Sequence, residues 1–323
     1  MVAMGEVAMI SEFSFTEQTE VERGFKPVFQ KKIVPILKKR EIEHIRRRRN
    51  LFVGAGGVAA FGVLAGLLVV FSAGIAKGVA VGIVCLMVAS MIAAYQQMKW
   101  RKGLGTEILP IMAEFLGDMI YGREEIALCE FEDRGVVPQF SKSEIEDAMA
   151  GSHKGLKWAM AEATLATKRG TRSGQRTVFK GLLMKIEIFG PSPRILMVPR
   201  GHAAGEWLGE LFSSTRKKTE RFETGIERFD AEVACYSKET DQARSFIDDH
   251  FAAGLLELGR SVSSRPVAAA MEGQWLYLAI PHSRNLLSFG SLWTPVQEIE
   301  ADLHKVFEEL TLPRRIIDLL SGR

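Results

Sequence analysis

Residues Leu51–Phe71 read LFVGAGGVAAFGVLAGLLVVF, a run of 21 residues without a charged side chain. As an α-helix this run would be about 30 Å long, which matches the hydrocarbon thickness of a bilayer. A second apolar run of 17 residues, Val79–Tyr95, follows after Ser72–Gly78. The two runs together are about twice as long as one bilayer span. Leu51–Met98, in which Lys77 is the only charged residue, therefore predicts a transmembrane hairpin of two antiparallel helices.

The alternative interpretation is a helical hairpin buried inside a soluble protein, although buried helices seldom lack charge over about 20 residues. The charges that flank the two runs predict the orientation. Lys38–Arg40 and Arg46–Arg49 precede the first run, and Lys99–Lys102 contains three bases after the second. Because loops rich in Lys and Arg stay in the cytoplasm, we expect both termini in the cytoplasm and the turn with Lys77 outside.

Small residues recur at four-residue spacing within the predicted spans. Gly62 and Gly66 form a G-x-x-x-G pair in the first run, and Gly74, Gly78 and Gly82 continue the spacing into the second. This spacing lets helix backbones approach closely. It predicts packing at Gly62, Gly66, Gly78 and Gly82 between the two helices of one hairpin, and a contact in a homo-oligomer is the alternative.

Charge is distributed unevenly along the 323 residues, a length typical of about two domains. The net charge is −5 over Met1–Glu22, +13 over Arg23–Lys102 and −5 over Gly103–Arg323. The first of these segments, 1–22, is expected to be an acidic flexible tail. The bases form a local collar around the apolar runs, whereas a nucleic-acid-binding domain more often spreads them over its surface, so no nucleic acid partner is expected. The three cysteines are far apart and favour neither a disulfide framework nor a zinc site.

Residues 23–50 predict a basic amphipathic helix. Phe25, Phe29, Ile33, Ile36 and Leu37 recur at helical spacing, with lysines between them. Such a helix can lie on the anionic cytoplasmic leaflet, or it can pack on the protein's own soluble part. The first alternative predicts that the membrane surface is contacted by aromatic and basic side chains, namely Phe25, Phe29, Lys31, Lys32, Arg46, Arg47, Arg48, Arg49 and Trp100.

The rest of the chain predicts a connecting helix over 103–122 and a cytoplasmic α+β domain over 123–323. Strands occur in adjacent pairs and do not alternate with helices, which favours an antiparallel sheet. The expected strands are Gly155–Thr167, Thr177–Phe189, Arg194–Val198, Arg228–Tyr236 and a hairpin of Pro266–Met271 with Trp275–Ile280 around Glu272-Gly273. Helices are expected at Asp241–Leu258 and from Val296 to Leu310. Pro313 is expected to stop the second of these helices.

Several short motifs occur in a recognisable order. They are Phe25-x-x-x-Phe29 with Pro35 before the apolar runs, Glu146-Asp147-x-x-x-Gly151, Val178-Phe179-Lys180-Gly181-Leu182, Phe229-x-x-x-Val233-x-Cys235-Tyr236-Ser237, Gln242-Ala243-Arg244 and Trp275-Leu276-Tyr277-Leu278-Ala279-Ile280. In this order the chain resembles the bacterial domain-of-unknown-function 3137 family. The resemblance implies a multi-pass protein of the bacterial inner membrane with a cytoplasmic α+β domain, and it supplies no activity or catalytic residue.

The sequence contains no motif that predicts catalysis or a bound cofactor or metal. Walker A needs a Gly-Lys pair, which the chain lacks, and neither His-Glu-x-x-His nor Gly-x-Ser-x-Gly occurs. We therefore expect a non-catalytic scaffold that is anchored in the lipid bilayer and binds a protein partner. One alternative is a membrane-tethered enzyme, such as a hydrolase, that uses His250 or His282, and a second is a membrane-shaping protein.

Overall fold

The structure, a computed structural model, describes residues 13–122, 125–169, 174–200, 219–263, 267–282, 287 and 290–321. The chain divides into two compact units. The hairpin unit comprises residues 1–115 and 287–308, and the sheet unit comprises 116–286 and 309–323.

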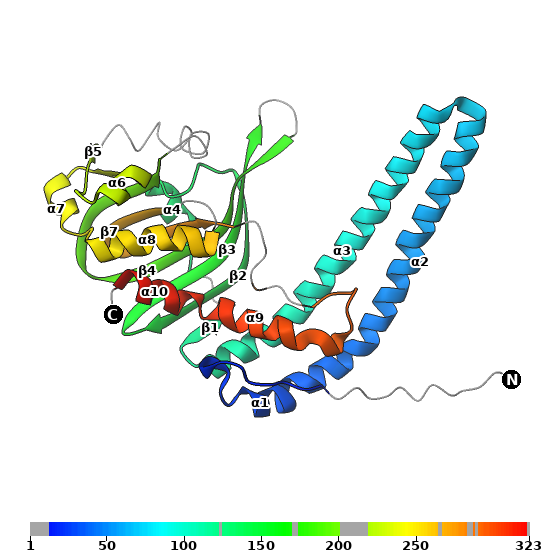
Figure 1. Cartoon of the computed structure of the whole chain (residues 1–323), viewed down its shortest axis with the longest axis horizontal. Coiled ribbons are helices and arrows are strands. Elements are labelled where there is room, and N and C mark those ends of the chain that lie inside the picture. The colour runs from blue at the N-terminus through cyan, green and yellow to red at the C-terminus, as the bar shows by residue number, and fades with distance from the viewer. Residues whose placement is uncertain are drawn as a thin grey trace. The chain divides into compact units, whose positions relative to one another are not determined.

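Two long helices form the hairpin of the hairpin unit (Figure 1). The short α1 (Phe25–Val28) and the π-helical η2 (Phe29–Ile33) lead into α2 (Val34–Ala73), and α3 (Ile75–Leu116) returns beside it. Gly74 alone separates the two helices, with φ of +95°, so the reversal is tighter than the predicted turn over Ser72–Gly78. A positive φ is accessible to glycine because it has no Cβ.

The helical hairpin is longer than the apolar runs, because polar extensions of both helices continue the same elements. The sequence predicts a separate connecting helix over 103–122, whereas α3 runs without a break through Pro110 to Leu116. Met119–Tyr121, the end of the predicted helix, is the strand β1 and pairs with Met149–Gly151. The helix ends where Gly117 adopts a φ of +78° and the chain turns into this strand.

The N-terminal segment and a C-terminal helix complete the hairpin unit. The first contains the short η1 (Glu20–Glu22), and the second consists of η5 (Val296–Ile299) and α9 (Glu300–Leu310). The predicted flexible tail is wrong for the part of it that is described, since Phe13 and Phe15 are buried. Residues 1–12 lie outside the described part of the chain.

The sheet unit contains a seven-stranded sheet in which every described pairing is antiparallel. Its path runs β1-β2-β3-β4-β6-β5, and β7 pairs with β4. The remaining strands are β2 (Lys142–His153), β3 (Leu156–Arg169), β4 (Gly174–Pro199), β5 (Glu220–Phe222), β6 (Val233–Ser237) and β7 (Ala268–Pro281). The predicted α+β class with an antiparallel sheet is confirmed.

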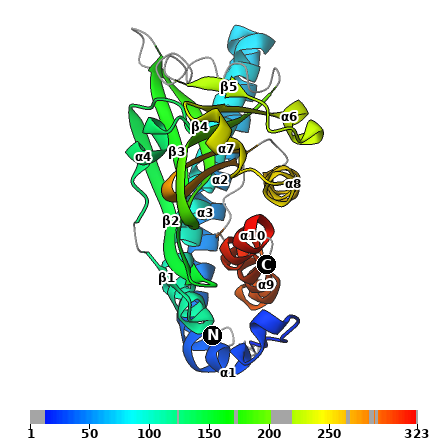
Figure 2. The same ribbon diagram turned by 90° about the vertical axis from the view of Figure 1, so that its left-hand side faces the viewer.

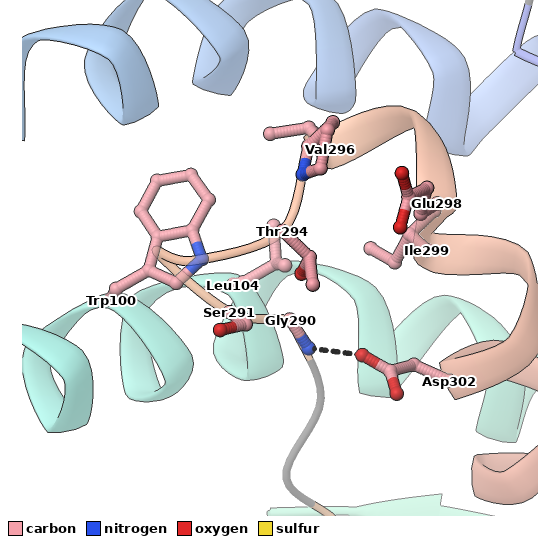
Figure 3. Close-up of a pocket in the computed structure, with 10 residues that line it drawn as sticks. Trp100, Leu104, Gly290, Ser291, Thr294, Val296, Glu298, Ile299 and Asp302 are labelled. Carbon is pink, nitrogen blue, oxygen red and sulfur yellow. Dashed lines mark hydrogen bonds between the residues drawn. The ribbon is translucent and has the colours of Figure 1, made fainter. Parts of the chain in front are cut away.

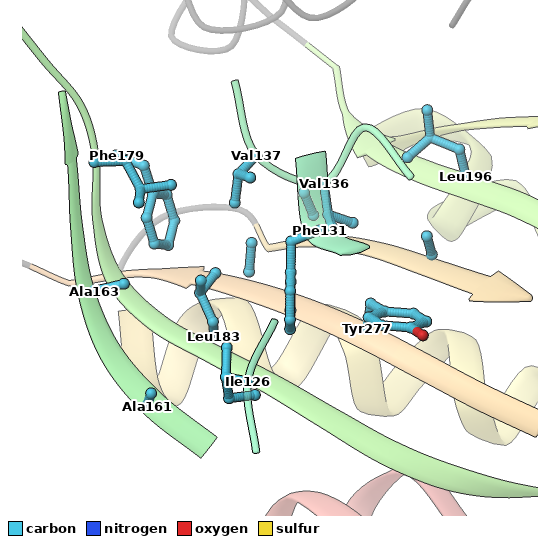
Figure 4. Close-up of a cluster of buried hydrophobic side chains, with 14 of the residues drawn as sticks. Ile126, Phe131, Val136, Val137, Ala161, Ala163, Phe179, Leu183, Leu196 and Tyr277 are labelled. Carbon is cyan, nitrogen blue, oxygen red and sulfur yellow. The ribbon is translucent and has the colours of Figure 1, made fainter. Parts of the chain in front are cut away.

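Helices cover both faces of this sheet. Figure 2 shows α8 (Asp249–Leu258) and α10 (Leu312–Ser321) on one face and α4 (Leu128–Asp133) on the other. The main apolar core lies under α4, where Phe131 inserts its ring between Leu183 and Tyr277 (Figure 4). Two shorter helices, α6 (Glu227–Glu232) and α7 (Thr240–Arg244), and the π-helical η4 (Gly259–Ser263) complete the described elements.

Two predicted interruptions of the sheet are wrong. Thr177–Phe189 and Arg194–Val198 belong to the single strand β4, and the expected hairpin at Glu272-Gly273 lies within β7. The register between these strands shifts on either side of Ser192, which is paired with Gly273. The glycines and prolines that resemble turn signals therefore occupy a bulge, where a residue without a ladder hydrogen bond is tolerated.

Two predicted elements in residues 228–258 are also wrong in part. The residues before Val233 form the helix α6 and not the start of a strand. Within α6, the side chain of Asp230 accepts hydrogen bonds from the backbone amides of Thr224 and Gly225. The expected helix Asp241–Leu258 is two helices, because Asp248 caps the start of α8 by accepting the Phe251 amide at 2.7 Å. N-capping satisfies an amide that has no partner in the first turn of a helix.

Candidate membrane-anchoring site

Large apolar side chains face outward along the apolar section of the hairpin. Those of Val53, Phe61, Leu68, Phe71, Ile75 and Met91 are between 66% and 88% exposed. In each helix only 11% of the most apolar 18-residue window is buried, and both helices are long and apolar enough to cross a membrane by length and composition. A core helix of a soluble protein would be mostly buried, so the exposure argues against that alternative.

The predicted small residues lie where the two helices approach most closely. A Cβ on Gly62 would stand 2.3 Å from Cβ of Cys85, and one on Gly78 would stand 2.5 Å from the carbonyl oxygen of Gly66. The absence of side chains at these positions therefore permits the contact between α2 and α3. A Cβ on Gly82 would meet no atom within 4 Å, although the backbone nitrogen of Gly82 lies 3.7 Å from the position of a Cβ on Gly66.

The aromatic residues of the predicted amphipathic helix lie inside the hairpin unit. Phe25 and Phe29 are fully buried, and their rings pack with Phe15 at centroid distances of 5.1 Å and 5.5 Å. Phe307 of α9 lies 4.7 Å from Phe25. The prediction that Phe25 and Phe29 contact the membrane surface is wrong, because protein covers both rings, and the alternative of packing on the chain itself holds.

A buried hydrogen bond attaches the N-terminal segment to α9. Glu22 is 1% exposed, and its Oε1 lies 2.9 Å from Nδ1 of His304. Burial raises the pKa of Glu22, but hydrogen bonds from the backbone of Gln18 and from His304 lower it overall. Thr16 adds a hydrogen bond from its amide to Glu300 at 2.6 Å. These contacts hold Thr16 and Glu22 against α9.

Trp100 is also buried, at 2% exposure, although the sequence predicts it at the membrane interface. Its ring packs against His44 of α2 at a centroid distance of 5.1 Å. Trp100 lines a small pocket together with Gly290, Thr294 and Asp302 (Figure 3). This pocket has room for about one water molecule, which excludes a substrate-sized ligand.

Residues 290–297, which we call the strap, lie across both helices of the hairpin unit. The amide of Leu292 donates to Gln97 of α3 at 2.9 Å, and the carbonyl of Ser291 lies 3.0 Å from Nε2 of His44 on α2. Burial lowers the pKa of His44, and the charge of Arg48 lowers it further. A neutral His44 is therefore favoured at the contact between the strap and α2. No sequence pattern indicates this contact between residues about 250 positions apart.

The basic residues of the predicted surface divide into exposed and paired groups. Lys31, Arg46, Arg48 and Arg49 are exposed, and so are Lys99, Arg101 and Lys102 on α3. Lys32 is exposed but bonds to Glu114 at 2.7 Å. Arg47 is largely buried and pairs with Glu43 at 2.6 Å. The structure thus leaves Lys31, Arg46, Arg48 and Arg49 on the surface, as a membrane contact requires.

Arg40, another base of the predicted collar, joins α2 to α3. Arg40 lies 2.6 Å from Glu107, and its guanidinium also contacts Glu43 and the carbonyl oxygen of Gly103. The hydrogen bond to Glu107 is the largest contribution that raises the pKa of Arg40. This residue is a structural cross-link between the polar extensions of the two helices, and it is not free to bind lipid.

The sheet unit contains a separate polar cluster on the side of α4. Lys185 Nζ lies 2.7 Å from Glu130 Oε2, and the hydroxyl of Tyr277 donates to the same oxygen at 3.1 Å. Arg134 lies over the Tyr277 ring at 4.2 Å. Burial raises the pKa of Tyr277; it also raises that of Glu130, which the ammonium of Lys185 nevertheless lowers overall. The charges compensate one another, which is typical of a structural network.

The two histidines of the enzyme alternative lie in different elements, His250 in α8 and His282 directly after β7. His250 is exposed in the first turn of α8, beside the capping Asp248. The backbone amide of His282 donates to the carbonyl oxygen of Lys180 at 2.9 Å. Within the described residues, no three His, Cys, Asp or Glu side chains are grouped as a metal site would require.

Comparison with known proteins gives one match. Residues 177–321 match the model of a family described as Protein of unknown function (DUF3137). No curated protein and no solved structure matches the chain. The matched region contains the motifs from Val178 to Ile280 and excludes the apolar helices and the motif at Glu146. Over residues 177–321 the chain therefore resembles the DUF3137 family, as its sequence motifs predict.

Proposed function

We propose that this protein is a non-catalytic scaffold of the bacterial inner membrane. In this proposal α2 and α3 cross the bilayer as a hairpin, both termini are cytoplasmic, and the sheet unit binds a protein partner at the membrane. The observation that carries the proposal is the outward exposure of large apolar side chains, such as Phe71 at 88%, along a hairpin whose interior contact is made by glycine. Such a surface is stable in lipid and is a liability in water.

The exposed bases support the orientation. Arg46, Arg48, Arg49, Lys99 and Lys102 lie at the open end of the hairpin, while the turn has only Lys77. The excess of Lys and Arg marks the cytoplasmic side. The exposed bases would also attract anionic lipid, at about 1 kcal/mol for each base near the surface.

An unpaired strand edge supports the binding of a protein partner. β1 pairs with β2 only at Met149–Gly151, so no described strand pairs with the outer edge of Lys142–Glu144. Lys142, Ser143 and Glu144 are exposed there. An extended segment of another protein can add to such an edge through backbone hydrogen bonds.

The membrane proposal is tested on the full chain in native membranes. We expect carbonate at high pH to leave the protein in the membrane fraction. In a Cys129→Ser background, Lys77→Cys should react with an impermeant maleimide added outside intact cells, whereas Lys142→Cys should react only after lysis. Release of the protein by carbonate would overturn the proposal, and labelling of the two cysteines in the opposite pattern would overturn the orientation.

The partner is tested by photo-crosslinking in native membranes with mass spectrometry. A photoreactive residue at Glu144, on the open edge of β2, should capture a protein that the same residue at Asp241 does not. Asp241 is a matched control because it is exposed on α7, away from that edge. Equal products from both positions would exclude this edge as the binding site. The enzyme alternative stays a prediction, which an activity screen with His250→Ala and His282→Ala would test.

A further inference from the structure

The strap exposes one large aromatic side chain while it buries its neighbours. Leu292 and Val296 are 1% and 6% exposed, but Trp293 between them is 52% exposed. Exposure of an indole ring costs free energy in water, since the ring is among the largest apolar surfaces that a side chain offers. Trp293 is therefore better suited to an environment less polar than water, whereas Leu292 and Val296 are already covered by protein.

The position of Trp293 follows from the hydrogen bonds that hold the strap. Besides the contacts with Gln97 and His44, Gly290 donates its amide to Asp302 at 2.8 Å and accepts from Nε of Arg101 at 3.2 Å. The backbone on the N-terminal side of Trp293 is thus bonded to α2, α3 and α9. A ring attached to a backbone held in this way has a fixed height along the hairpin.

That height coincides with the start of the chargeless run. The Trp293 ring lies 6.0 Å from the ring of Phe52, edge to face, and Phe52 is itself 54% exposed. Arg48 lies one turn before Phe52, and its guanidinium is 5.9 Å from the centroid of the Phe52 ring. Beside Trp293 the surface of α2 therefore passes from charged to apolar side chains within one helical turn. The same transition occurs in a bilayer at the boundary between headgroups and acyl chains.

We infer that Trp293 inserts into the headgroup region of the bilayer and is an interfacial contact of the hairpin unit with lipid. This inference rests on the proposed function, because it needs α2 and α3 to span the membrane. Indole suits this boundary since its ring is apolar and its N–H can donate to water or to a lipid oxygen. The strap would then fix the depth of the hairpin through a residue some 240 positions after Phe52 in the sequence.

Lipid fits this surface better than a second copy or another protein. The exposed ring is continuous with the outward apolar surface that begins at Phe52 and Val53. The exposed bases beside it, Arg48, Arg49 and Lys99, suit anionic headgroups. A second copy would present the same bases and repel the first.

The test uses full-length protein in vesicles of phosphatidylcholine and phosphatidylglycerol whose acyl chains carry bromine at a shallow position. Bromine quenches tryptophan fluorescence on contact. We expect bromine-dependent quenching in the wild type, loss of most of it in Trp293→Phe, and no loss in Trp275→Phe, the control in the sheet unit. Bromine placed deeper in the chains should quench less.

Equal quenching of the wild type and Trp293→Phe, in protein that carbonate does not release, would overturn the inference while the membrane proposal stands. Quenching that is absent, in protein that carbonate does release, would show that the proposed function has failed. A change of oligomeric state in Trp293→Phe without a change in quenching would assign the ring to a second copy and overturn the inference.

Discussion

The apolar section of the hairpin and the core of the sheet unit use similar residues in opposite ways. In the sheet unit, Phe131 and Leu183 are fully buried, and the strand residues that face outward are more polar. In the hairpin, Leu68 and Phe71 are 71% and 88% exposed, and glycine occupies the closest contact between the helices. The comparison teaches that large apolar side chains are left exposed in this chain mainly where the helices are long and apolar enough to cross a membrane by length and composition.

The largest effect should come from the core of the sheet unit. Phe131→Ala removes a fully buried ring that packs on Tyr277 at 5.3 Å. We expect it to lower the free energy of unfolding by about 3–5 kcal/mol. Denaturant melts of full-length protein in detergent, followed by near-ultraviolet circular dichroism, measure this change. Ile120→Ala, at an exposed position of β1, is the control and should stay within about 0.5 kcal/mol of the wild type.

A charge on the hairpin should have the next largest effect, although the site is exposed. Phe61→Arg should disfavour membrane insertion by about 2.5–3.5 kcal/mol, the cost of arginine at the centre of a span, because Phe61 is the middle residue of Leu51–Phe71 and is 66% exposed. The fraction of protein that resists carbonate extraction measures it. Ile42→Arg is the matched control, since Ile42 is 76% exposed on the polar part of α2. If both variants insert as well as the wild type, the hairpin lies in water.

The contact between the two helices should be sensitive to a single methyl group. In Gly78→Ala the new Cβ would stand 2.3 Å from Val70 and 2.5 Å from the Gly66 carbonyl oxygen. Overpacking of this kind costs about 1–3 kcal/mol, which thermal melts of the protein in detergent can resolve. Gly82→Ala adds the same atom where nothing lies within 4 Å and should melt as the wild type does. Equal melting of both variants would show that the helices do not touch at Gly78.

The smallest effect should be a dependence of the hairpin unit on pH through His44. Burial lowers the pKa of this histidine, so the unfolded chain binds its proton more readily than the folded chain does. Stability from this group is complete above the unfolded pKa of about 6.5 and decreases as the pH falls through that value. Thermal melts between pH 8 and pH 5 measure the decrease.

His44→Gln provides the comparison for that measurement, because it keeps a donor toward the Ser291 carbonyl and does not titrate. As the pH falls, the melting temperature of the wild type should decrease more than that of the variant, so the wild-type value minus the variant value should become smaller from pH 8 to pH 5. A constant difference across the range would mean that the pKa of His44 is the same in the folded and the unfolded chain.

Much of the fold could be predicted because local patterns decide it. The chargeless runs predicted two helices, and the pairing of β-rich segments predicted an antiparallel sheet, since hydrophobic periodicity reports which face of an element is covered. The errors occurred where a local signal has two meanings. Gly190-Pro191 and Glu272-Gly273 are turn signals, but in this sheet they occupy a bulge between β4 and β7. Phe25 and Phe29 form an apolar stripe that fits a lipid surface and a protein core equally well.

By itself the sequence determined that two nearly chargeless helices form and which class the fold belongs to, because both depend on composition and period within one element. Only the tertiary structure decided which aromatic residues face outward. Trp100 is adjacent to the apolar run yet buried, whereas Trp293 is nearly 200 residues away and is exposed beside Phe52. The reason is that the strap packs across both helices, and the burial of a side chain depends on segments that reach it from anywhere in the chain.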